Sequence, residues 1–364
     1  MKNMMAFPEG AAGPGLFPAV KPELRRDMDA LLLLIEKTFP VPARFRRGLA
    51  SDVAELSRLL TSARGERSLS YLNRPPMLSA YLRYFLPWNL YRLCRLLPSL
   101  ELPLATGDRI LDLGAGPLTF PIALWLCRPE FRELSLEFHC QDLSRAALDA
   151  GKKLFTALSG GPCPWTIRVR GARQDPAEGK QALVAVLNMY NELFQSVSPG
   201  DGGGLYRLAR SQGALLAAHA GKDGRILIVE PGIPRSGQCI ALLRDVLAGM
   251  GHPPLSPCAH DGPCPFPGPV KDAGPRNPPG GPSHRSAEQR VEQRRSADPS
   301  AAAGNAVRGM GKSASKWCHF AFDTQDAPAA LLRLSAAAGL PKERATLSFL
   351  LAGPARGEQS PAEQ

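Results

Sequence analysis

The stretch ILDLGAGPLTF, residues 110–120, decides the fold of this 364-residue chain. A short apolar run that ends in Gly-x-Gly is typical of a buried parallel strand followed by a tight turn and a helix. Glycines in the turn let the backbone approach a ligand closely, and the next helix directs its N-terminal N–H groups into the same crevice. Asp142 ends the next predicted strand, where a carboxylate can accept the hydroxyls of a ribose. The stretch therefore predicts a nucleotide-type site.

Strand and helix signals alternate along the chain from residue 107 onward. Further strands are predicted in LSLEFHCQDLS and at 165–170, 182–189 and 225–230, with helices in SRAALDAGKKLFTAL and near 204–219, 237–249 and 328–338. Strands that alternate with helices of this length indicate βαβ units and a parallel sheet. The predicted fold class is therefore α/β with a Rossmann-like sheet, which the final strand ATLSFLLAG completes.

The glycine turn lacks the third glycine with which a dinucleotide fingerprint holds a pyrophosphate. Its acid-led form, Asp112-x-Gly114-x-Gly116, resembles the first motif of class I S-adenosylmethionine-dependent methyltransferases, in which a glycine is common where this chain has Leu118. The resemblance implies that S-adenosylmethionine is the cofactor. A Rossmann-like domain that has lost its ligand is the alternative.

The same resemblance assigns roles along the chain. Asp112, Gly114, Gly116, Asp142 and Leu143 are the predicted cofactor-binding residues, the last two as the ribose-binding loop. The segment LNMYNELF, residues 187–194, resembles the loop beside the transferred methyl group. From position alone, its Asn191 and Glu192 are the predicted catalytic residues, which would orient the methyl acceptor.

The N-terminal third is basic and helical. Residues 22–106 predict an all-helical module, and residues 1–100 hold 15 Lys and Arg against 8 Asp and Glu, within a net charge of +11. Such a positive charge favours a polyanionic partner, and nucleic acid is the leading candidate. The alternative is that the charge reflects a compositional bias and has no binding role. In residues 78–97, tyrosines and a tryptophan alternate with arginines. This pattern is typical either of a surface that stacks on nucleic-acid bases or of the buried stripe of a helix.

Three cysteines have unusual neighbours: Cys258 and Cys264 in PCAHDGPCP, and Cys318 in KWCHF. Two thiols on a proline-bounded loop and a third from a distant segment predict a metal site for zinc or an iron-sulfur cluster. Both need a fourth ligand, for which the candidates are His260, His319, Cys239 and Cys163. The chain shows no secretory signal and no apolar run long enough to span a bilayer, so we expect a cytoplasmic location with reduced thiols rather than disulfides.

The order of ILDLGAGP, YNEL, VEPG, PCAHDGPCP, WCHF and SFLL resembles the small-ribosomal-subunit methyltransferase-like family, which has bacterial and mitochondrial members. The resemblance covers most of residues 78–266 and 316–352. It implies ribosomal RNA or the small ribosomal subunit as partner, and a [4Fe-4S] cluster with Cys258, Cys264 and Cys318 as three ligands. Mitochondrial members take the fourth cysteine from a C-terminal extension, and this chain has no cysteine after Cys318.

The predicted function is thus an S-adenosylmethionine-dependent methyltransferase that acts on ribosomal RNA or the small subunit. One alternative is a non-catalytic assembly factor with a methyltransferase-like fold and an iron-sulfur cluster, and another is a small-molecule methyltransferase. We expect a monomer without a membrane partner. The predicted organisation is a disordered N-terminus (1–21), the helical module (22–106), the α/β domain with the cysteine loop (107–266), a disordered insertion (267–316), the completion of the sheet (317–353) and a disordered tail (354–364).

Overall fold

The computed structural model describes residues 15–63, 71–172, 179–198, 201–266 and 317–355. The predicted disordered insertion at 267–316 and nearly all of the tail at 354–364 lie outside these residues. The predicted disordered N-terminus is described only from Gly15 onward. There Phe17 stacks on Phe322 with ring centroids 5.0 Å apart, so apolar packing fixes the end of a segment that the sequence alone predicted to be disordered.

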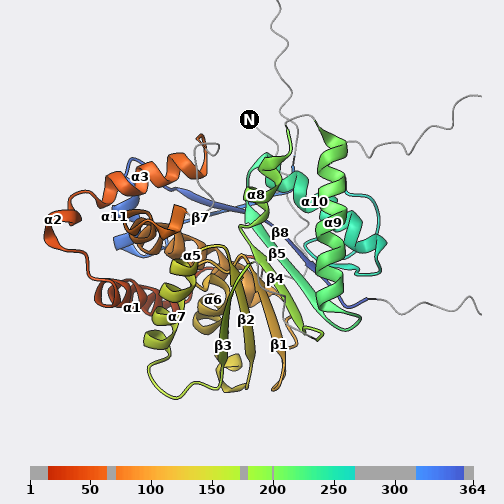
Figure 1. Cartoon of the computed structure of the whole chain (residues 1–364), viewed down its shortest axis with the longest axis horizontal. Helices are drawn as coiled ribbons and strands as arrows, with labels where there is room; N and C mark the ends of the chain where they lie inside the picture. Colours follow the sequence, from red (N-terminus) through yellow and green to blue (C-terminus); the bar gives the residue numbers. More distant parts are fainter. Residues whose placement is uncertain (1–14, 64–70, 173–178, 199–200, 267–316, 356–364) are drawn as a thin grey trace, which may run out of the picture.

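An eight-stranded sheet lies at the centre of the fold, in the order β3-β2-β1-β4-β5-β8-β6 with β7 paired to β8 (Figure 1). The five parallel strands are β1 (Arg109–Leu113), β2 (Glu137–Asp142), β3 (Thr166–Gly171), β4 (Leu183–Leu187) and β5 (Arg225–Pro231). Strand β8 (Arg344–Ala352) is antiparallel to β5, and it pairs antiparallel with β6 (Pro254–Ser256) and β7 (Phe320–Asp323). The predicted α/β class with a Rossmann-like sheet is confirmed, because helices alternate with the parallel strands from β1 to β5.

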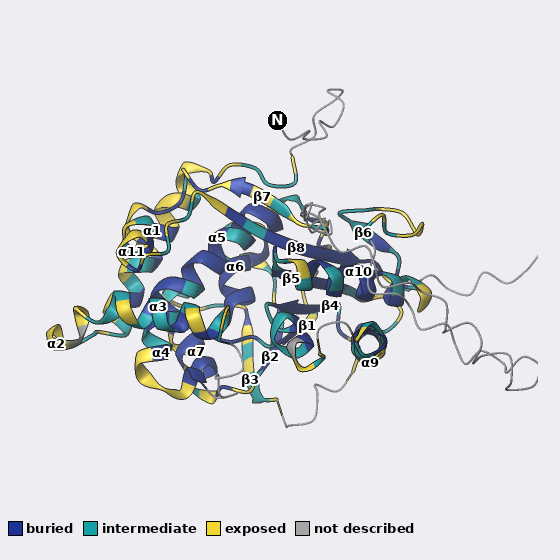
Figure 2. Ribbon diagram, turned by 90° about the horizontal axis from the view of Figure 1, so that it is seen from above, coloured by how far each residue is buried: buried dark blue, intermediate teal, exposed yellow. Residues whose placement is uncertain are grey.

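Helices cover both faces of the sheet. Alternation along β1 sends Ile110 into a core with α6 (Thr119–Cys127) and α7 (Arg145–Ser159). It sends Leu111 into a second core with α9 (Gly202–Ala220) and α10 (Pro234–Gly249). Figure 2 shows α6 and much of β8 in the buried colour, whereas exposed residues gather on peripheral helices such as α2. Both layers leave the carboxyl ends of β1, β2 and β4 at one edge, where a site can form.

The N-terminal helices share the first of these cores. They are α1 (Pro22–Thr38), α2 (Ala43–Arg46), α3 (Leu49–Leu60), α4 (Pro75–Ala80) and α5 (Leu86–Leu96), with a π-helical turn at Tyr81–Phe85. Helix α11 (Ala329–Ala337) packs beside them, since the indole N–H of Trp88 donates to Ser335 Oγ at 3.1 Å. The segment predicted only to complete the sheet therefore also closes the helical module. Among the described residues, no helix is long and apolar enough to cross a membrane.

The aromatic and arginine run of this module is mostly a buried stripe. Tyr84, Trp88 and Tyr91 are each 2% exposed or less. Arg83 pairs with Glu36 at 2.7 Å, and Arg95 pairs with Asp326 at 3.0 Å. These side chains are therefore committed to the core, and a base-stacking surface made of them is excluded. Tyr81 is the exception, because it reaches a cavity.

Candidate functional site

A cavity of about 560 Å³ lies at the carboxyl ends of the parallel strands. Gly114 and Gly116 line it from the turn after β1, and Asp142 and Leu143 line it from the end of β2. Glu192 lines it from α8 (Tyr190–Leu193), the short helix after β4. Five residues that the sequence predicted from separate motifs therefore meet around one hollow.

The glycine turn needs both of its glycines. Gly114 has φ +71°, and a Cβ there would lie 2.9 Å from the Cβ of Met189, so any side chain would collide with the segment after β4. Gly116 has φ +53°, and a Cβ there would meet nothing within 4 Å, so its bare backbone faces open space. Leu118 also has a positive φ, +57°, but its side chain is fully buried and does not line the cavity. The departure from glycine at this position therefore leaves the cavity free.

Asp142 is held by the backbone around it. Its Oδ2 accepts from the Gly116 N–H at 2.9 Å, and its Oδ1 accepts from the Ser144 N–H at 2.7 Å. Burial raises the pKa of Asp142, while these backbone hydrogen bonds oppose the rise. Each carboxylate oxygen keeps further acceptor capacity for ribose hydroxyls. The neighbouring Leu143 is 56% exposed at the cavity, where an apolar side chain can lie against an adenine ring.

Ser144 joins this loop to the helical module. Its Oγ accepts from the Ala147 N–H at 3.1 Å and so caps α7, as Ser is favoured to do at a helix N-terminus. The same Oγ donates to Oδ1 of Asn73 at 2.8 Å. The N-terminal module is therefore fixed directly beside the predicted ribose loop. The bare backbone at Gly116, the held carboxylate and the exposed Leu143 together fit S-adenosylmethionine.

Asp112 lies beneath the turn rather than in the cavity wall. It is 1% exposed, and both of its carboxylate oxygens lack a hydrogen-bond partner among the described residues. Burial, and secondarily the charge of Asp142, raises the pKa of Asp112 well above its ordinary value, which favours the neutral acid. Its predicted contact with the cofactor remains a prediction, since Asp112 is not among the side chains that line the cavity.

The two predicted catalytic residues differ in their placement. Glu192 lines the cavity, whereas the amide of Asn191 donates from Nδ2 to the carbonyl oxygen of Asn188 at 2.9 Å. Fully buried Glu230 at the end of β5 accepts from the N–H groups of Tyr190 at 2.8 Å and Asn191 at 2.9 Å. Asn191 therefore shapes the start of α8, and of the two it is Glu192 that faces the cavity.

Several wall residues were missed by the sequence motifs. Tyr71, Leu72 and Tyr81 come from the helical module, and Gln212, Leu215 and His219 come from α9. The interleaved aromatics of residues 78–97 contained a signal for Tyr81, but no local pattern separates it from its buried neighbours. Sequence offered no signal for the α9 residues, because only the packing of α9 places them at the cavity.

The three predicted metal ligands lie in one region. Burial raises the pKa of Cys318 to about 11, and the nearby Cys258 and Cys264 contribute to the rise, which Arg244 opposes. No group of three or more His, Cys, Asp or Glu side chains in the described part of the chain has an arrangement that could hold a metal ion. Among the described residues, the side chains are therefore not arranged to hold zinc or an iron-sulfur cluster.

Of the four candidates for a fourth ligand, the two histidines contact other groups, and the two cysteines lie elsewhere in the fold. His260 Nδ1 lies 3.3 Å from Nη2 of Arg244, and Nδ1 of His319 lies 3.2 Å from the carbonyl oxygen of Trp317. Cys239 is buried in the core of α9 and α10. Cys163 precedes β3, at the opposite edge of the sheet from β6 and β8. The structure therefore selects none of the four.

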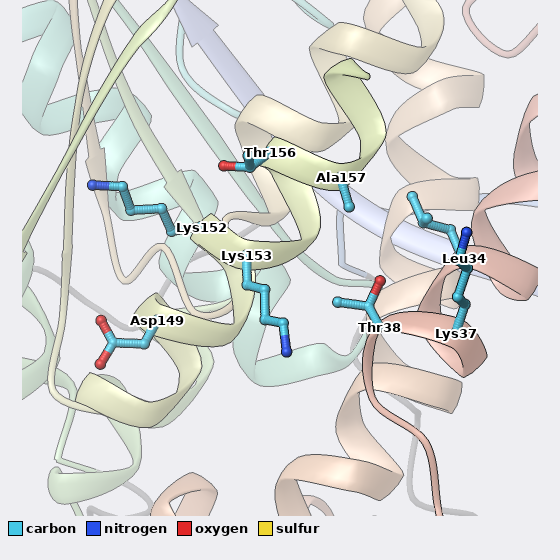
Figure 3. Close-up of a pocket in the computed structure, with 8 residues that line it drawn as sticks. All are labelled: Leu34, Lys37, Thr38, Asp149, Lys152, Lys153, Thr156 and Ala157. Carbon is cyan, nitrogen blue, oxygen red and sulfur yellow. The ribbon is translucent and has the colours of Figure 1, made fainter. Parts of the chain in front are cut away.

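A second hollow, a groove of about 720 Å³, lies between α1 and α7. Lys37 of α1 and Lys152 and Lys153 of α7 line it, together with the acidic Asp149. Figure 3 shows Lys152 and Lys153 pointing in different directions, with Lys37 across the groove.

Comparison with known proteins finds matches among solved structures alone. No family model and no curated protein matches the chain. An S-adenosylmethionine-dependent methyltransferase from Thiobacillus denitrificans, solved with S-adenosyl-L-homocysteine, is 22% identical over 40% of this chain and 48% of its own, with a TM-score of 0.25. One from Geobacter sulfurreducens, also with S-adenosyl-L-homocysteine, is 22% identical over 42% and 54%, with a TM-score of 0.27.

A third similar structure is geranyl diphosphate C-methyltransferase from Streptomyces coelicolor, which is 12% identical over 70% of this chain and 75% of its own, with a TM-score of 0.32. The chain thus spans about half the length of the Thiobacillus and Geobacter proteins, at 48% and 54%. None of these similarities bears on the substrate of this chain.

Proposed function

We propose that this chain is an S-adenosylmethionine-dependent methyltransferase. The observation that carries the proposal is the carboxylate of Asp142, held between the Gly116 and Ser144 N–H groups at the rim of the cavity. S-adenosylmethionine, when bound, supplies an electrophilic methyl group. Asp142 would accept hydrogen bonds from the ribose hydroxyls, Leu143 would lie against the adenine, and Glu192 would face the methyl acceptor from the cavity wall. Orientation of two reactants in a cavity is the main contribution of the protein to such a transfer.

Isothermal titration calorimetry with S-adenosylmethionine tests this proposal. Asp142→Ala removes both ribose acceptors, so we expect its affinity to fall by roughly a hundredfold, as the loss of hydrogen bonds to a charged group predicts. Glu55→Gln is the control, because Glu55 lies on α3 and pairs there with Arg58 at 2.8 Å, away from the cavity. A wild-type protein that gives no heat of binding would overturn the cofactor assignment.

We further propose ribosomal RNA of the small subunit as the methyl acceptor. The resemblance of the motifs to the small-ribosomal-subunit methyltransferase-like family supports it, and so does the groove with Lys37, Lys152 and Lys153. The groove lies along α7, which starts after Ser144 at the cavity and rises about 12 Å to Lys152 at 1.5 Å per residue. An RNA strand that follows the groove therefore runs toward the cofactor cavity.

Salt dependence of binding to purified small-subunit RNA tests the RNA proposal. Replacing Lys37, Lys152 and Lys153 with Gln should reduce the slope of log K against log salt by about 2, because each phosphate that a lysine neutralises on a single strand contributes about 0.7 to that slope. Replacing the exposed Lys21 and Lys222 should change it little. Equal slopes in the wild type and the groove variant would show that the groove does not bind the RNA. Transfer of a labelled methyl group to this RNA tests catalysis directly.

A non-catalytic small-subunit assembly factor is the second candidate function. The observation that favours it is the placement of Asn191, whose amide holds the carbonyl of Asn188 and does not face the cavity. Such a factor would bind S-adenosylmethionine and RNA without transferring a methyl group. Binding of both ligands, together with no methyl transfer to small-subunit RNA, would decide for it.

A further inference from the structure

The three N–H groups from Gly114 to Gly116 are already engaged and are not available to an anionic group. The Gly114 and Ala115 N–H groups both donate to the carbonyl oxygen of Gln141, at 2.8 and 2.9 Å, and the Gly116 N–H donates to Asp142. Glu192 adds a second carboxyl side chain to the cavity wall. S-adenosylmethionine nevertheless carries a carboxylate on its amino-acid part, so a donor for this group has to come from another element.

Tyr81 of the helical module supplies such a donor. It lines the cavity, and its ring stacks on Phe85 with centroids 5.7 Å apart and an interplanar angle of 26°. Its hydroxyl oxygen accepts from Nδ2 of Asn89 at 3.5 Å, which leaves its own O–H to donate. Burial, with the charges of Glu192 and Asp142, raises the pKa of Tyr81, so the proton stays on the oxygen.

A cation lies behind this hydroxyl. Arg92 donates from Nη1 to Oδ1 of Asn89 at 2.8 Å, so the guanidinium, the amide and the phenol form one directed chain of hydrogen bonds. Arg92 also interacts electrostatically with Tyr81. A chain of this kind polarises its last O–H and makes it a better donor. Tyr81 is, moreover, the first residue of a π-helical turn, a distortion that is frequent at functional sites.

We propose that Tyr81 binds the carboxylate of the amino-acid part of S-adenosylmethionine, with Asn89 and Arg92 as its positioning residues. Tyr81 lines the same cavity as Asp142 and Glu192, which we propose for the ribose and for the acceptor side. A phenol O–H in that wall can donate to the carboxylate of the amino-acid part of the cofactor. The inference rests on the proposed function and adds to it that the N-terminal helices complete the cofactor site.

Calorimetry with two ligands tests the inference. S-adenosylhomocysteine carries the amino-acid part, and 5′-methylthioadenosine lacks it. Tyr81→Phe should weaken S-adenosylhomocysteine roughly tenfold, the loss expected for one hydrogen bond to a charged group, and leave 5′-methylthioadenosine unchanged. Tyr84→Phe is the matched control, since Tyr84 belongs to the same π-helical turn but its hydroxyl lies 3.5 Å from the Leu340 carbonyl oxygen.

A double-mutant cycle separates positioning from direct contact. Asn89→Ala should weaken S-adenosylhomocysteine in the wild type but add little in the Tyr81→Phe background, because Asn89 acts through the Tyr81 hydroxyl. The inference is overturned if Tyr81→Phe weakens both ligands equally or neither of them. A wild type that binds neither ligand would instead refute the proposed function, and the inference with it, whereas binding that Tyr81→Phe leaves intact refutes the inference alone.

Discussion

Glu230 is the buried carboxyl group whose replacement tests the structure most directly. It is fully buried at the end of β5, and its two oxygens accept from the N–H groups of Tyr190 and Asn191. Burial raises the pKa of Glu230 from 4.5 to about 8, although both backbone hydrogen bonds oppose the rise. The folded protein therefore holds a proton on this group that the unfolded chain releases above its ordinary pKa.

The sign of the pH dependence follows from this raised pKa. Between pH 4.5 and about 8 the folded state binds more protons than the unfolded state, so the contribution of Glu230 to stability falls as the pH rises. At about 1.4 kcal/mol per pH unit, the fall reaches at most about 5 kcal/mol over the whole window. Tyr190 and Cys239, which face Glu230, have pKa values raised well above their ordinary values and so away from this window.

Glu230→Gln removes the titrating group and keeps its shape. It also turns an NH₂ group toward one of the two N–H donors, which costs about 1–3 kcal/mol at any pH. We expect denaturant unfolding at pH 5, 6.5 and 8.5 to show that the unfolding free energy of the wild type falls as the pH rises. The unfolding free energy of the variant should change less over the same range, by several kcal/mol. Glu55→Gln, a change at an exposed pair, serves as control. Identical pH slopes in wild type and Glu230→Gln would refute the reasoning.

Three further substitutions test the packing around the site. Gly114→Ala should lower the affinity for S-adenosylmethionine and cost more than the roughly 1–2 kcal/mol of a left-handed alanine, because its Cβ meets Met189 at 2.9 Å; calorimetry and chemical denaturation measure both effects. Leu118→Ala should destabilise the protein by about 2–5 kcal/mol while cofactor affinity stays unchanged, and a matched loss of affinity would contradict its placement outside the cavity. Ser335→Ala leaves the buried indole N–H of Trp88 without its acceptor, so a lower unfolding free energy by about 1–3 kcal/mol is expected, and no change would argue against the contact between α11 and α5.

Local signals determined much of the fold. The strand and Gly-x-Gly turn at residues 110–120 formed as expected, since apolar burial on both faces of β1 and the positive φ of two glycines are properties of short segments. Asp142 was predicted for the same reason, because it is the last residue of its strand. Residues 78–97 illustrate the limit of such signals. Their interleaved aromatics and arginines form one pattern in the sequence, whereas the structure has a π-helical turn at Tyr81–Phe85 and then α5, which begins at Leu86.

The sequence by itself determined the order of the elements, the glycine turn and the acid at the end of β2, because each depends on neighbours within a few residues. Only the tertiary structure decided which side chains support or line the cavity. It placed Glu230 against α8, some 39 residues earlier in the chain, and it separated Tyr81 at the cavity from Tyr84 and Tyr91 in the core. Those choices depend on which surfaces pack together, and burial, rather than residue type, sets the pKa and hydrogen-bonding role of each group.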